Sequence, residues 1–276
     1  MAAVDPVAHD APAAEVHKNH DIYFVPGLRR GLSLLEVLAA ARRPLGVAEL
    51  ARELDLTRSS VFRLVYTLRH MGYLESVDDS KSVTLGPRVL NIGFAYLASK
   101  DIIEVSRADL EALRDRTNVT AHLAIRNERE VLYLNCVQTR SGFLSTLNVG
   151  ARLPAYATPM GWLLLSDLAS RDLARLFGRG PLEQLTSQTP RTIQAVAARV
   201  AEAAARGYAL SRGAVEPGGS SIAAPVLDQA GRVVAAIDIS GPDSAFDFAK
   251  FESRDLREVV TCAQRISARL GHHPGG

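Results

Sequence analysis

The chain has 276 residues, enough for two ordinary domains that each bury a core. Hydrophobic residues make up 47% and charged residues 22%, a balance that excludes an extended disordered chain. The net charge of +2 means that any nucleic-acid-binding surface must be a local basic patch. The two cysteines, Cys136 and Cys262, lie far apart, which excludes a disulfide framework and a zinc knuckle. We interpret them as buried thiols in a reducing cytoplasm.

The start of the chain shows no secretory signal, and no apolar run is long enough to span a membrane. We therefore expect a cytoplasmic protein without a membrane partner. Residues 1–24 mix Ala, Pro, Asp and His without periodicity, which predicts a flexible tail.

Apolar residues at helical spacing predict three helices, over 28–41, 47–54 and 58–71. In the first helix the residues expected to face the core are Leu28, Leu32, Leu35 and Leu38. Thr57 is a favourable N-cap for the third helix, and Gly72 can end that helix as a C′ glycine. Strand-like runs at 73–77 and 82–85 flank a polar turn and predict a hairpin. Three helices followed by a hairpin indicate a winged helix-turn-helix over residues 25–86.

The third helix has an apolar stripe and a basic face. The stripe consists of Val61, Leu64, Val65, Leu68 and Met71. The outward side carries arginines and hydroxyls and no acid, which suits the major groove of DNA. A solvated helix of any small domain is the alternative. The candidate DNA contacts, including one at the tip of the wing, are Arg29, Thr57, Arg58, Ser59, Ser60, Phe62, Arg63, Tyr66 and Lys81.

The rest of the chain predicts a linker helix over residues 87–100 and an α+β sensor domain over 101–272. Helices are expected over 102–117, 159–168, 192–206 and 251–270. Strands are expected over 119–125, 131–137, 143–149, 208–211, 221–227 and 233–240, the last two forming a hairpin.

Short segments in both halves of the chain follow a known pattern in order and spacing. In the first half they are residues 27–35, 47–51, 59–64, 72–74 and 85–87. In the second half they are residues 149–154, 186–193, 206–209, 222–226 and 239–242. Together these segments resemble the IclR family of transcriptional regulators. The resemblance covers about residues 25–271 and implies an α/β, GAF-like effector-binding domain behind the winged helix-turn-helix. It also implies a homodimer, often a dimer of dimers, on a palindromic operator of double-stranded DNA.

The effector of such proteins is commonly an aromatic or short carboxylic acid from a catabolic pathway, so the resemblance implies a small organic ligand here. It places the last strand of the hairpin beside that ligand, where the alternation of side chains puts Asp238 and Ser240 on one face with Val234 and Ala236. The candidate effector-binding residues are Thr146, Leu153, Pro159, Met160, Gly161, Trp162, Ser211, Gly219, Ser220, Ser221, Asp238 and Ser240.

Two features of this candidate site depart from the pattern of the family. Amide groups at the helix start near residue 159 are expected to receive a carboxylate, yet Pro159 removes one donor. Met160 and Trp162 add bulk that favours an aromatic ligand. Asp238 would repel an anion, so it is expected to accept from a ligand hydroxyl, to pair with Arg152 or Arg212, or to lie solvated on a surface strand.

Other classes of function remain open at this point. His122 in a strand raises the question of an enzyme, but no catalytic, phosphate-binding or metal motif accompanies it, so we expect no catalytic residue, cofactor or metal. We interpret His122 as a partly buried strand residue. A sensor that uses its helix-turn-helix for protein docking is the other alternative.

Overall fold

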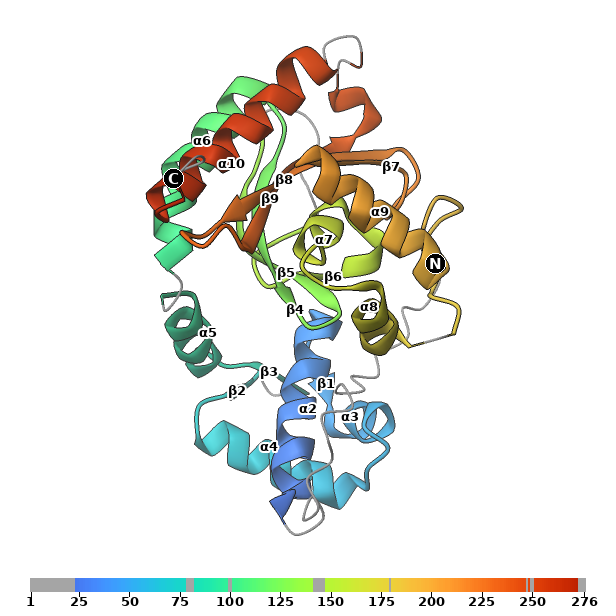
Figure 1. Ribbon diagram of the computed structural model, residues 1–276. Helices are drawn as coiled ribbons and strands as arrows, with labels where there is room; N and C mark the ends of the chain where they lie inside the picture. The colour runs from blue at the N-terminus through green and yellow to red at the C-terminus, as the bar shows by residue number, and fades with distance from the viewer. Residues whose placement is uncertain are drawn as a thin grey trace. The chain divides into compact units, whose positions relative to one another are not determined.

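The computed structural model describes residues 23–77, 82–98, 101–140, 147–178, 180–246, 248 and 251–272. The predicted tail up to residue 22, Lys81 and Thr146 lie outside these residues. The chain divides into two compact units, Met1–Ser99 and Lys100–Gly276, and each has its own buried core (Figure 1). Among the described residues, no helix has the length and apolar character needed to cross a membrane.

The first unit has the element order of a winged helix-turn-helix. Its described helices are α2 (Pro26–Ala41), α3 (Val47–Glu53), α4 (Arg58–His70) and α5 (Arg88–Ala98). Its strands β1 (Leu45–Gly46), β2 (Leu74–Ser76) and β3 (Ser82–Leu85) pair antiparallel in the order β1-β3-β2. The hairpin of β2 and β3 is the predicted wing, which confirms the predicted fold of this half.

The core of the first unit confirms most of the predicted stripe on α4. Val61 and Val65 are buried, and Leu64 and Leu68 pack against them together with Leu34 of α2. Met71 was predicted to be buried, but it is exposed because it caps the end of α4, where the chain turns away.

The predicted buried face of α2 is partly wrong. Leu28 and Leu32 are 62% and 53% exposed, whereas Leu34 and Leu38 are buried. The core reaches only the second half of this helix, so the first two turns have no layer to pack against within the unit.

Two glycines shape the transition from α4 to the wing. Gly72 has a positive φ of 76°, which confirms the predicted helix end. Gly86 lies so close to it that a Cβ atom at Gly86 would be 2.5 Å from the carbonyl oxygen of Gly72. The Gly86 N–H donates to the carbonyl of Tyr73 at 2.8 Å, which holds the end of β3 against the start of β2.

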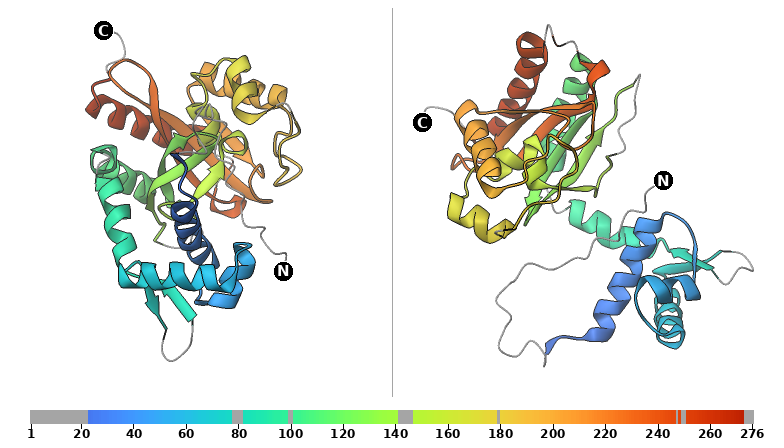
Figure 2. Two further views of the ribbon diagram at one scale, coloured as in Figure 1. Left: turned by 90° about the horizontal axis from the view of Figure 1, so that it is seen from below. Right: turned by 90° about the vertical axis from the view of Figure 1, so that its right-hand side faces the viewer.

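The second unit is an antiparallel sheet between two helical layers (Figure 2). Its strands are β4 (Ala121–Asn127), β5 (Glu130–Val137), β6 (Arg152–Pro154), β7 (Ala209–Arg212), β8 (Gly219–Leu227) and β9 (Val233–Pro242), in the antiparallel order β6-β5-β4-β9-β8-β7. Its helical segments are α6 (Asp101–Thr117), η1 (Ala155–Ala157), α7 (Pro159–Leu164), α8 (Ser170–Phe177), α9 (Ile193–Arg206), η2 (Asp243–Ala245), η3 (Phe251–Leu256) and α10 (Arg257–Arg269).

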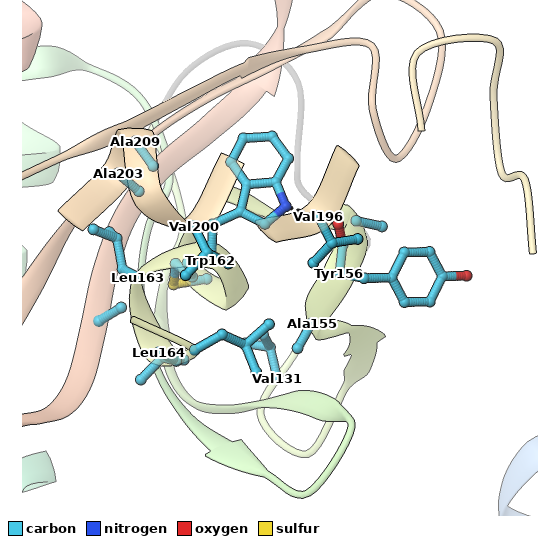
Figure 3. Close-up of a cluster of buried hydrophobic side chains, with 14 of the residues drawn as sticks. Val131, Ala155, Tyr156, Trp162, Leu163, Leu164, Val196, Val200, Ala203 and Ala209 are labelled. Carbon is cyan, nitrogen blue, oxygen red and sulfur yellow. Dashed lines mark hydrogen bonds between the residues drawn. The ribbon is translucent and has the colours of Figure 1, made fainter. Parts of the chain in front are cut away.

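The two helical layers bury opposite faces of this sheet. The core beneath α7, α8 and α9 contains Tyr133, Ala223 and Ala236 from the strands. Trp162 and Val200 of the helices belong to the same core (Figure 3). Helices α6 and α10 pack against one another and against the other face. The predicted α+β class is therefore confirmed.

Local differences from the predicted elements have identifiable causes. Of the predicted strand 143–149, residues 147–149 form a loop, and the pairing partner of β5 is instead β6. Gly150 lies in a turn with a φ of +87°, and β6 begins two residues later, at Arg152. The predicted helix 159–168 ends at Leu164, and α8 was not predicted.

A β-bulge changes the predicted faces at the start of β9. Val226 pairs with Ala235 and Leu227 with Val233, so Val234 is an extra residue. The prediction placed Val234 on the face of Ala236 and Asp238, but Val233 is the residue that packs into that core. Beyond the bulge the predicted alternation is observed.

Candidate functional site

One side of α4 offers basic and aromatic side chains to solvent. Arg58, Ser59 and Arg63 are exposed, and Phe62 and Tyr66 are 61% and 67% exposed. Within the described residues, neither Arg58 nor Arg63 forms an ion pair, so both guanidinium groups are available to a ligand. Because the apolar stripe of α4 faces the core, the exposed side must face outward.

Two predicted contact residues also form the start of this helix. The N–H of Ser60 donates to Oγ1 of Thr57 at 3.2 Å, so Thr57 is the N-cap of α4. The hydroxyl oxygens of Thr57 and Ser60 lie 2.9 Å apart. Arg29 is exposed on α2.

The second unit contains a cavity of about 250 Å³ beside the ends of β7 and β9 and the beginning of β8. Of the predicted effector residues, the cavity is lined by Leu153, Pro159, Ser211, Gly219, Ser220, Ser221, Asp238 and Ser240. Residues that line it and were not in the predicted site are Tyr133, Leu147, Thr158, Ala214, Val215, Glu216 and Gly241.

The polar wall of the cavity comes from the register of the sheet. Ser211, Ser221 and Ser240 are directly opposite one another on β7, β8 and β9. Two residues away on β9, and therefore on the same face, Asp238 pairs with His122 of β4. The three serine hydroxyls thus form one row across the strands, and the carboxylate of Asp238 lies in the next row on the same face of the sheet.

Asp238 is held by a partner that the sequence did not suggest. Its Oδ1 lies 2.8 Å from Nδ1 of His122, and its Oδ2 accepts a hydrogen bond from Ser221 Oγ at 2.9 Å. Asp238 is 3% exposed and His122 is 0% exposed. Burial lowers the pKa of His122, but the charge and hydrogen bond of Asp238 outweigh burial and raise the pKa to about 9. The raised pKa favours a protonated imidazole facing the Asp238 carboxylate.

This pairing corrects three predictions. Asp238 does not pair with Arg152, which binds Glu130, or with Arg212, which binds Asp243. It is also not solvated on a surface. His122 is fully buried rather than partly buried, and the ring of Tyr133 contacts it edge-on with the centroids 5.3 Å apart.

Three predicted effector residues do not line the cavity. Met160 and Trp162 are buried in the core beneath α9, and the indole N–H of Trp162 donates to the carbonyl of Tyr156 at 2.7 Å (Figure 3). Gly161 allows close packing, since a Cβ atom there would lie 2.0 Å from the carbonyl oxygen of Ala155. These side chains follow the helix into the core, so they give the cavity no aromatic wall.

The start of α7 offers less to an anion than predicted. The Thr158 hydroxyl already accepts the N–H of Gly161 at 3.0 Å, and Pro159 has no N–H. Among the described lining residues there is no lysine, arginine or histidine, while Asp238 and the exposed Glu216 are both acidic. The described wall is therefore an acceptor surface with hydroxyl groups.

A winged helix-turn-helix with a free basic face, joined in one chain to a unit with a ligand-sized cavity, defines a transcriptional regulator that carries its own sensor domain. The model of the IclR helix-turn-helix domain matches residues 27–78, and the model described as "Bacterial transcriptional regulator IclR C-terminal" matches residues 94–268. The chain belongs to the IclR family of DNA-binding transcriptional regulators. Proteins of this family are regulators and not enzymes, which removes the enzymatic interpretation of His122.

Individual relatives agree with this assignment. The Pca regulon regulatory protein of Pseudomonas putida is 29% identical over 271 residues, which cover 98% of this chain and 92% of that protein. The transcriptional regulator BhcR of Paracoccus denitrificans is 30% identical over 88% of this chain and 86% of its own length. A regulator from Rhodococcus sp. RHA1 has a similar structure, with a TM-score of 0.78 at 28% identity over 90% of this chain and 98% of that one.

A further solved structure shows the same fold with a ligand. It is an IclR homolog from Microbacterium hydrocarbonoxydans complexed with 4-hydroxybenzoate, with a TM-score of 0.75 at 23% identity. The similarity covers 88% of this chain and 98% of that one.

Proposed function

We propose that this regulator binds a palindromic operator as a homodimer or a dimer of dimers, with α4 in the major groove. The exposed side of α4 supports this role, because Arg58 and Arg63 have free guanidinium groups that can pair with guanine edges. Thr57, Ser59, Ser60 and Tyr66 are suited to phosphate contacts, and Arg29 and Lys81 to the flanking backbone or minor groove.

We further propose that a small aromatic compound, either a hydroxylated ring or an aromatic acid from a catabolic pathway, binds in the cavity of the second unit. The observation that carries this proposal is the cavity itself, where Asp238 and three serines face apolar walls from Leu147, Leu153 and Pro159. Its volume of about 250 Å³ is below the range typical of drug-sized ligands, so a compact ligand with one ring is expected. The Microbacterium homolog is complexed with 4-hydroxybenzoate, a compound of that class, which supports the proposal.

The effector would act by binding one arrangement of the recognition helices better than another. Its differential affinity for the two states then sets the upper limit of the change in operator affinity. Residues 25–86, 87–100 and 101–272 would serve as the DNA-binding, linker and effector-binding segments.

A gel-shift titration with the DNA upstream of the chain's own gene tests both parts. We expect binding that weakens steeply with salt and that changes when a panel of hydroxylated aromatic compounds and aromatic acids is added. Salt-insensitive binding, or no binding, would favour protein docking by the helix-turn-helix. A complete lack of response to the panel would reject the aromatic effector.

A further inference from the structure

We propose that a hydroxyl group of the effector, and neither a carboxylate nor an ammonium group, binds at Asp238, and that His122 is the positioning residue that imposes this choice. The inference rests on the proposed function, because it concerns the ligand of the same cavity. It adds which chemical group of the ligand meets Asp238, and it gives a role to His122, which does not line the cavity.

The carboxylate of Asp238 has free acceptor capacity directed at the ligand. Oδ1 is bound by His122 and Oδ2 by Ser221, and each carboxylate oxygen can accept two hydrogen bonds. An ionised carboxylate offers no proton, so a ligand that uses the remaining lone pairs must donate. The Ser221 hydroxyl donates its hydrogen to Asp238, so only the lone pairs of its oxygen remain for the ligand. This again favours a ligand group that donates a hydrogen bond.

A carboxylate on the ligand has nothing at this end to neutralise it. The described lining residues include no cationic side chain, and the imidazolium of His122 lies behind Asp238 with no exposed surface. An anion would therefore meet the carboxylate first, and two like charges at close range in a buried site repel strongly.

An ammonium group on the ligand is disfavoured for the opposite reason. Asp238 already has a counter-cation at 2.8 Å, so the pair is neutral overall. A second cation would be repelled by the imidazolium and would bury a charge without compensation. A hydroxyl donates to Asp238 without bringing a net charge, so it avoids both costs.

The surroundings of His122 leave Asp238 as the carboxylate that faces the ring. From β9 the hydroxyl of Ser240 lies 3.4 Å from Nδ1. From β5 the ring of Tyr133 contacts the imidazole, and burial raises the pKa of this phenol well above its usual value, so it stays neutral. Cys136 is opposite His122 in the strand register and, after Asp238, also raises the pKa of His122, while Nε2 of the imidazole has no hydrogen-bond partner among the described residues. The imidazolium is thus bound by one carboxylate and shielded from the ligand.

Calorimetric titration of the full chain at pH 7 with phenol, benzoate and benzylamine tests this inference. These probes share one ring and differ in the group that they present. We expect phenol to bind at least about tenfold more tightly than either charged probe, as hydrogen bonds to charged groups typically allow. In Asp238→Asn the preference for phenol over benzoate should fall by about tenfold, because an amide can also donate.

His122→Gln separates positioning from a purely structural role. Glutamine can still donate a hydrogen bond but carries no charge, so Asp238 becomes uncompensated and benzylamine should gain about tenfold relative to phenol. A structural role would weaken all three probes together. Glu130→Gln, which removes a carboxylate away from the cavity lining, is the control and should leave the ranking unchanged. If His122→Gln does not fold, Asp238→Asn decides the question alone.

The outcomes distinguish this inference from the proposed function. Benzoate binding as tightly as phenol, with both lost in the cavity-filling Ser221→Phe variant, overturns the inference and keeps the cavity as the effector site. Phenol binding that Ser221→Phe does not alter places the ligand elsewhere, and the proposed role of the cavity fails. No binding of any probe at millimolar concentration rejects both.

Discussion

Nδ1 of His122 lies 2.8 Å from Oδ1 of Asp238, and this pair joins two neighbouring strands at the wall of the cavity. The two residues are separated by 116 positions in the sequence. Asp238 lines the cavity and His122 does not. If the effector binds at Asp238 as proposed, the charge of His122 would act on a ligand that His122 does not touch, and stability, ligand choice and pH dependence would be linked through one interaction.

The stability of the second unit should fall as the pH rises above neutrality. The pKa of His122 is raised from 6.5 to about 9 in the folded chain, so its stabilising effect is fully present below pH 6.5. That effect is lost as the pH rises through about 9, and it amounts to on the order of 3 kcal/mol. Denaturant unfolding between pH 6 and 10 measures it. His122→Asn should lack this part of the slope, and an unchanged slope would contradict the assignment.

Removing one partner of the pair should cost more than removing both charges. His122→Phe leaves the buried Asp238 uncompensated and should lower the free energy of unfolding by about 3–5 kcal/mol. Adding Asp238→Asn should restore part of this loss, because the buried charge is removed. Chemical denaturation of the two single variants and the double variant measures the coupling. Additive effects would show that the two side chains do not interact.

Arg63→Ala should weaken operator binding by about 1–3 kcal/mol if its guanidinium pairs with a guanine. The same loss should be seen in a gel shift at fixed salt, without a change in folding, because Arg63 is exposed. Arg171→Ala is a suitable control, since Arg171 is an exposed arginine of the second unit. An Arg63→Ala variant that binds like the control would remove this residue from the DNA interface.

Gly161→Ala should destabilise the second unit by about 1–3 kcal/mol, the range for overpacking. The added Cβ would meet the carbonyl of Ala155 at 2.0 Å, and the contact is with backbone, which cannot move aside easily. Gly180→Ala is the control, because a Cβ there meets nothing within 4 Å. Thermal unfolding of both variants tests the prediction. Full stability of Gly161→Ala, with weakened effector binding, would restore Gly161 to the ligand site.

The sequence predicted the winged helix-turn-helix well because its signals are local. The stripe on α4, the Thr57 cap and the Gly72 helix end each depend on residues within a few turns, and the structure shows all three except for Met71 of the stripe. The prediction failed at Leu28 and Leu32, whose spacing is that of a buried face. Spacing states which residues share a face, but it does not state how far along the helix a core extends.

The lining of the cavity was predicted only in part, because its residues meet through strand pairing. Alternation along β9 placed Asp238 and Ser240 together, and both line the cavity. The same kind of reasoning could not place His122 against Asp238, since that requires the pairing of β4 with β9. The family resemblance also placed Trp162 in the candidate effector site, although α7 turns that side chain into the core.

By itself, the order of residues determined the family, the two-part organisation and the basic face of α4, since these follow from local periodicity and short motifs. Only the tertiary structure decided that Asp238 is paired with a buried imidazolium and that Met160 and Trp162 turn away from the cavity. The physical reason is that burial and charge pairing depend on the register between distant strands, which no single segment encodes.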